Sequence, residues 1–182
     1  MDRFSYHKDQ KAEIITIKER AITLKLSDAD VERIFKKAGA AGLTVPELLQ
    51  NFIGDLVDGT YSNGSDERDY AQRWFDRCWF GMFPEHTFTQ YLIQSDQFDV
   101  VVGLWNDIQT AKEDLADTLE HPDEYGADEV SAFKEDIADW EKDIHGIFAA
   151  FKSNAAENKI GTLEQEMELV IRWKASLEKA LA

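Results

Sequence analysis

The chain has 182 residues, of which 43% are apolar and 12% aromatic, and its formal net charge is −16. This apolar content excludes a disordered chain, and the length is enough for one compact unit or two small ones with a buried core. The negative charge favours a basic partner over a nucleic acid, although acidity for solubility alone explains it equally well.

The acidic residues are not spread evenly. Residues 1–58 contain nine Lys/Arg and ten Asp/Glu, whereas residues 59–182 contain eleven and 26. We therefore expect three regions, 1–58, 59–95 and 96–182, of which the last two carry almost all of the negative charge. The single cysteine and the lack of a long apolar stretch predict a cytoplasmic protein with no membrane partner.

The first region begins with two segments typical of β-strands. Residues 13–17 form a β-branched run, and in residues 20–26 apolar Ile22, Leu24 and Leu26 alternate with other side chains, which predicts a half-buried strand. Ser27 is positioned to cap a helix that ends at Gly39 to Gly42. Thr44-Val45-Pro46-Glu47 is a capping box for a second helix through Val57.

Strand, helix and helix in this order resemble a ribbon–helix–helix unit. The resemblance spans Arg20 to Val57, notably Leu26-Ser27-Asp28-Ala29-Asp30 and Gly42-Leu43-Thr44-Val45-Pro46-Glu47-Leu48-Leu49. It implies a homodimer whose paired strands contact duplex DNA through Arg20, Thr23 and Lys25, with a phosphate at the helix start near Thr44. The alternative is a unit that only dimerises.

The middle region is the most aromatic part of the chain. A helix is predicted from Asp66, and its aromatic residues are Tyr70, Trp74, Phe75, Trp79, Phe80 and Phe83. A stripe of this kind is more often core than a binding patch, and both interpretations stay open.

The third region is predicted to be helical throughout. Apolar residues spaced three and four apart form a heptad seam: Val130, Phe133, Ile137, Trp140, Ile144, Ile147 and Phe151. An earlier helix has Val101, Trp105, Ile108, Leu115 and Leu119 at similar spacing, and residues 121–126 join the two, which predicts an antiparallel hairpin. A last helix carries Leu163, Met167, Val170, Trp173, Leu177 and Leu181.

This hairpin is strongly acidic. From Asp96 to Asp143 there are 16 Asp/Glu and three Lys, and like charges recur three and four residues apart. Such stacking destabilises a helix, so a surface that binds a basic partner is a hypothesis of equal standing with a solvated helix face. The candidate partner-binding residues are Glu113, Asp114, Asp117, Glu120, Glu135, Asp136, Asp139 and Asp143.

No motif indicates an enzyme. His7, His86, His121 and His145 are scattered, and no phosphate-binding glycine loop is present. We therefore expect no catalytic residues, no cofactor and no metal site. The predicted fold is mainly α, with a short N-terminal strand in the ribbon–helix–helix-like unit and an acidic helical hairpin plus a C-terminal helix.

One further segment carries a resemblance. The stretch Asp58-Gly59-Thr60-Tyr61-Ser62-Asn63-Gly64-Ser65-Asp66-Glu67-Arg68-Asp69-Tyr70-Ala71-Gln72-Arg73-Trp74-Phe75-Asp76-Arg77-Cys78 is similar to one in proteins of bacterial mobile elements, and the layout resembles type II-A anti-CRISPR proteins, including those of phages. The resemblance implies an inhibitor of Cas9 with its guide RNA in the host cytoplasm, with duplex DNA as a further contact. The alternatives are a ribbon–helix–helix transcriptional regulator and a dimeric scaffold.

Overall fold

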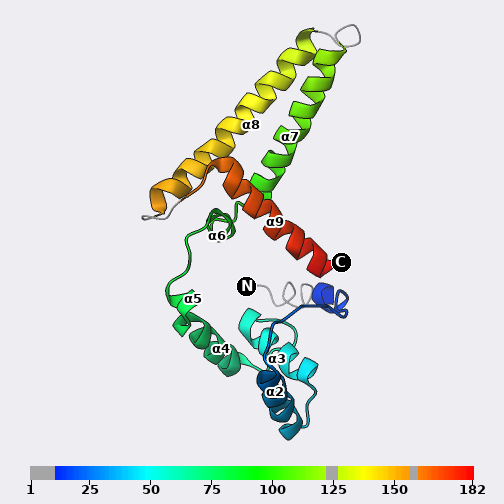
Figure 1. Ribbon diagram of the computed structural model, residues 1–182, viewed down its shortest axis with the longest axis vertical. Helices are drawn as coiled ribbons and strands as arrows, with labels where there is room; N and C mark the ends of the chain where they lie inside the picture. Colours follow the sequence, from blue (N-terminus) through cyan, green and yellow to red (C-terminus); the bar gives the residue numbers. More distant parts are fainter. Residues whose placement is uncertain (1–10, 122–126, 156–159) are drawn as a thin grey trace. The chain divides into compact units, whose positions relative to one another are not determined.

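A computed structural model describes residues 11–121, 127–155 and 160–182. It divides into two compact units, Met1–Glu85 and His86–Ala182, each of which is considered by itself. Helices dominate both units (Figure 1). Among the described residues, none of the helices combines the length and the apolar content that crossing a bilayer requires.

In its described residues, the first unit has a helical turn at 11–14 followed by the helices α2 (Asp28–Ala40), α3 (Val45–Val57), α4 (Ser65–Arg77) and the short α5 (Trp79–Met82). The predicted caps are confirmed, because the Ser27 side chain accepts a hydrogen bond from the Asp30 N–H and Thr44 forms a capping box with Glu47. Helix α2 packs on α3, and α3 on α4.

The turn from α3 into α4 is held by polar contacts. Asp58 ends α3 in the left-handed conformation, with φ of 53°. The Asn63 backbone and side-chain N–H groups donate to the Asp55 carboxylate at 2.6 and 2.8 Å. These bonds, the side-chain one first, lower the pKa of Asp55. Both bonds therefore favour the ionised form of Asp55.

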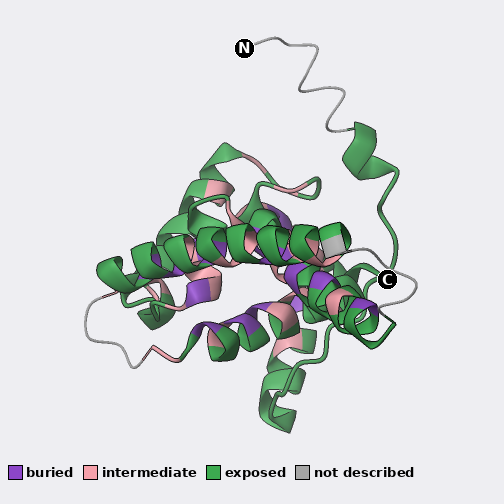
Figure 2. Ribbon diagram, turned by 90° about the horizontal axis from the view of Figure 1, so that it is seen from above, coloured by how far each residue is buried: buried purple, intermediate pink, exposed green. Residues whose placement is uncertain are grey.

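The predicted N-terminal strands are wrong for the described residues, and with them the ribbon–helix–helix unit. Residues 11–14 form a helical turn, and residues 17–27 have no strand assigned. Ile22, Leu24 and Leu26 stay exposed, and Figure 2 draws this part of the chain, after the grey N-terminal trace, in the colour of exposed residues. The alternating pattern favours extended backbone, but a strand also needs a hydrogen-bonding partner, and the described part of the chain supplies none.

The second unit is built on a helical hairpin. Helices α7 (Phe98–Glu120) and α8 (Ala127–Asn154) lie side by side and run in opposite directions, as Figure 1 shows. The predicted connection at 121–126 lies, except for His121, outside the described residues. Helices α6 (Phe88–Gln94) and α9 (Leu163–Leu181) pack against the hairpin.

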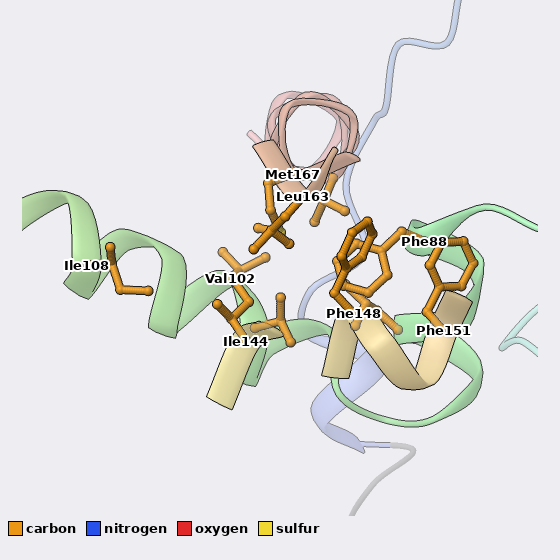
Figure 3. Packing of buried hydrophobic residues seen from close by; sticks show 11 residues of the cluster. Phe88, Val102, Ile108, Ile144, Phe148, Phe151, Leu163 and Met167 are labelled. Carbon is orange, nitrogen blue, oxygen red and sulfur yellow. The ribbon is translucent and has the colours of Figure 1, made fainter. Parts of the chain in front are cut away.

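The core of this unit lies where the four helices meet. Phe88 of α6 packs against Phe148 and Phe151 of α8, while Leu163 and Met167 of α9 lie over Val102 of α7 (Figure 3). The predicted seam is confirmed at Ile137, Ile144 and Phe151, which are buried. The heptad pattern omits buried Phe148, because α8 contacts α6 and α7 on adjacent faces.

Candidate partner-binding surface

One ion pair between α7 and α8 shows which sides of the two helices lie together. Lys112 of α7 and Glu141 of α8 approach to 2.7 Å, so these two residues lie on the same edge of the helix pair. The pair is half-exposed on both sides and contributes little to stability. The position of this pair shows which residues of α7 and α8 share each edge of the hairpin.

The opposite edge is lined by aspartates. An α-helix turns by about 100° per residue, so Asp114, two residues after Lys112, and Asp136, five before Glu141, both lie on the other edge. Residues three or seven positions from Asp114 or Asp136 lie near the same edge, because these spacings are close to whole turns of the helix. Together they form what we call the acidic edge: Asp107, Asp114, Asp117, Asp136, Asp139 and Asp143, all of them exposed.

The two helices contribute to the acidic edge at matching levels. With Lys112 opposite Glu141, Asp114 lies level with Asp139, and Asp117 with Asp136. Successive carboxylate levels are about 5 Å apart, given the helical rise of about 1.5 Å per residue. Asp117 also has a histidine beside it, since His121 Nδ1 lies 3.3 Å from its carboxylate. The result is a row of closely spaced negative groups on a rigid helix pair.

A half-buried tryptophan lies beside this row. Trp140 precedes Glu141 by one residue, about 100° around α8, and so faces the acidic edge rather than the Lys112 edge. The electron-rich face of an indole attracts Arg and Lys side chains. Trp140 also packs against the core of this unit, so only part of its indole lies beside the aspartates.

The structure brings together five of the eight predicted partner-binding residues. Asp114, Asp117, Asp136, Asp139 and Asp143 share the acidic edge, whereas Glu113 and Glu120 face away from α8 and Glu135 faces away from α7. Sequence reasoning missed Asp107. Its spacing of seven residues from Asp114 is the signal that indicates a shared edge.

The predicted DNA-contacting residues do not form a comparable surface. Arg20, Thr23 and Lys25 lie in the exposed segment 17–27, which forms no ribbon in the described residues. At Thr44 the start of α3 is occupied, because the Thr44 N–H donates to the Glu47 carboxylate at 2.8 Å. That bond and the Thr44 hydroxyl lower the pKa of Glu47, so a negative charge already fills the place expected for a phosphate.

The aromatic residues of α4 and α5 are largely exposed rather than core. Trp74 contacts Phe52 and Phe80 edge-on, with ring centroids 5.5 and 6.2 Å apart, and Trp79 contacts Phe83 at 4.6 Å. The favoured interpretation of this stripe as core is therefore not what the described residues show. Ala71 is the one α4 residue that is buried.

The second unit also has an open groove between α6 and α9. Its volume is about 520 Å³, and its apolar wall is formed by Ile93, Leu169 and Trp173. The polar side chains at its rim are Thr87, Thr89, Gln90, Gln94 and Glu166.

No group of three or more His, Cys, Asp or Glu in the described residues is arranged to hold a metal ion; His7 lies outside them. Comparison with known proteins adds no assignment, since neither a family model, nor a curated sequence, nor a solved structure matches the chain.

Proposed function

We propose that the acidic edge of the α7–α8 hairpin binds a positively charged protein groove that normally holds nucleic acid, and that binding inhibits that protein. The observation that supports this is the separation of charge across the hairpin: six exposed aspartates line one edge, and Lys112 pairs with Glu141 on the other. A surface adapted only to solubility usually mixes both signs.

The proposed partner is Cas9 loaded with its guide RNA. The similarity of Asp58 to Cys78 to proteins of mobile elements, and the layout resembling type II-A anti-CRISPR proteins, support this choice. Cas9 holds guide and target in positively charged channels, which are the kind of groove that a row of carboxylates fits. The exposed part of the Trp140 side chain lies beside these carboxylates and can contact an arginine of such a channel.

The proposal is tested by measuring Cas9–guide cleavage of a DNA target, and binding to Cas9–guide, with and without the protein. We expect inhibition by the unchanged chain. Reversing two charges at one level of the acidic edge, Asp114→Lys with Asp139→Lys, is expected to weaken binding about tenfold or more, because like charges then face each other across the interface.

A matched control separates position from total charge. Glu120→Lys with Glu135→Lys changes the net charge equally. Glu120 faces away from α8 and Glu135 faces away from α7, so both lie outside the acidic edge and inhibition is expected to persist. If the unchanged protein leaves cleavage unaffected, Cas9 is the wrong partner. If both double variants weaken binding equally, the edge has no special role.

A further inference from the structure

One asparagine of this chain, Asn63, is followed by a glycine. The others precede residues that carry a side chain: Asn51, Asn106, Asn154 and Asn158. Asparagine is a thermolabile residue, because the backbone nitrogen of the next residue can attack its side-chain carbonyl carbon. A glycine in that next position leaves the attacking nitrogen unhindered. Asn63 and Gly64 therefore combine the two residue types that favour this reaction.

The structure leaves the attacking nitrogen accessible. Asn63 is exposed and lies outside the helices, just before α4 begins. The Gly64 N–H donates to the Ser62 hydroxyl at 3.4 Å, which is long for a bond of this kind. Asn51 and Asn106, by contrast, lie inside α3 and α7, where the next backbone N–H takes part in the helical hydrogen bonds. Attack by a backbone nitrogen is therefore easier after Asn63 than after these helical asparagines.

The group that would be attacked is held by a neighbouring carboxylate. Asp55, in the last turn of α3, accepts hydrogen bonds from the Asn63 backbone N–H at 2.6 Å and from its side-chain Nδ2 at 2.8 Å. The side-chain bond, and then the backbone one, lower the pKa of Asp55, so it is ionised at neutral pH. For the reaction, the amide carbon of Asn63 must turn toward the Gly64 nitrogen and release Nδ2, which breaks the bond to Asp55.

The product of the reaction no longer fits this contact. Deamidation replaces the Nδ2 amide group, a donor, by a carboxylate oxygen, an acceptor. Two negative oxygens would then meet where Asn63 and Asp55 now lie 2.8 Å apart, and like charges at such a distance repel. The other polar link of the turn runs from Arg68 to Asp58 at 3.0 Å and to Ser62 at 3.2 Å, and it is not altered.

We propose that Asn63 is a site of spontaneous deamidation, that its contact with Asp55 suppresses the reaction, and that the product carboxylate prevents this contact from forming again. The Gly64 nitrogen forms a bond to Asn63 Cγ, the Cγ–Nδ2 bond breaks, and Nδ2 leaves as ammonia with the proton of the Gly64 N–H. Water then opens the cyclic imide at either carbonyl, which leaves aspartate or isoaspartate at position 63. An opening of the turn thereby becomes an irreversible change in the link between α3 and α4.

Prolonged incubation of the full chain at neutral pH, followed by proteolysis and mass spectrometry, measures conversion at each asparagine. We expect Asn63 to convert before the asparagines of the helices. Asp55→Ala is expected to raise the rate of conversion at Asn63 severalfold, because it removes the acceptor that holds the side-chain amide.

A matched control separates this contact from the general stability of the turn. Arg68→Gln breaks the other polar link and leaves both bonds to Asp55 in place, so Asn63 should convert at the rate of the unchanged chain. In urea, where the turn is open in every variant, the unchanged chain and Asp55→Ala should convert equally fast.

The effect of the product is tested with variants at position 63. Asn63→Asp adds the second carboxylate, whereas Asn63→Ala removes the amide without adding charge. We expect hydrogen exchange of the α3 and α4 backbone amides to be faster in Asn63→Asp than in Asn63→Ala, because repulsion adds to the lost bond. Asp55→Asn combined with Asn63→Asp swaps the amide and the carboxylate, so a donor again faces an acceptor. This double variant is expected to return exchange close to that of the unchanged chain.

The proposal is overturned if Asn63 converts no faster than the helical asparagines in both the unchanged chain and Asp55→Ala, since the site is then not reactive. It is also overturned if Arg68→Gln accelerates conversion as much as Asp55→Ala does, because protection then comes from the turn as a whole. An Asn63→Asp chain whose amides exchange no faster than those of Asn63→Ala would show that the product carboxylate leaves the turn closed.

Discussion

At the residue scale, Gly54 of α3 is in close contact with the turn that follows this helix. A Cβ atom added there would lie 2.5 Å from the Tyr61 carbonyl carbon and 2.7 Å from the Ser62 nitrogen, both backbone atoms. We expect Gly54→Ala to destabilise the first unit by about 1–3 kcal/mol in urea unfolding, because the backbone must move. Gly39, also helical and in the same unit, has nothing within 4 Å of such a Cβ. Gly39→Ala should therefore stabilise, by up to about 1 kcal/mol, and equal effects of both changes would contradict the packing around Gly54.

At the element scale, α6 is a short helix that contributes the centre of the second core. Phe88 is fully buried and contacts Phe148 and Phe151, with both pairs of ring centroids 5.2 Å apart. We expect Phe88→Ala to lower the free energy of unfolding of the second unit by about 3–5 kcal/mol, measured by chemical denaturation. Phe83→Ala, which removes an exposed ring outside this core, should cost less than about 0.5 kcal/mol. A small effect of Phe88→Ala would mean that α6 is not docked.

The elements also show what the sequence can and cannot predict. Helix caps at Ser27 and Thr44 are predicted correctly because a cap depends on residues within one turn. The strand at 20–26 is wrong because pairing depends on a distant segment that the local pattern does not contain. The acidic residues are identified from the sequence, but their division between an edge and two outward faces depends on how α7 meets α8, which the Lys112–Glu141 pair reveals.

At the scale of the whole molecule, repulsion between negative charges destabilises the folded state of the second unit. Residues 86–182 contain eight Lys/Arg and 21 Asp/Glu, a net charge of 8 − 21 = −13. Added salt screens this repulsion, so we expect the thermal midpoint of the second unit to rise by a few degrees from low to physiological ionic strength, measured by calorimetry. Asp136→Asn with Asp143→Asn should reduce the dependence on salt. A midpoint that falls as salt is added would show that attractive ion pairs dominate instead.

The uneven placement of lysines and aspartates on the α7–α8 hairpin gives it an electric dipole perpendicular to its long axis. The field of a cationic partner exerts a torque on that dipole, which turns the aspartate-lined side of the hairpin toward the partner before contact. Collisions then begin in nearly the correct orientation, so most of the gain is in the rate of complex formation rather than in its lifetime. Moving a lysine from the Lys112 side to the aspartate side would lower the rate of complex formation without changing the net charge.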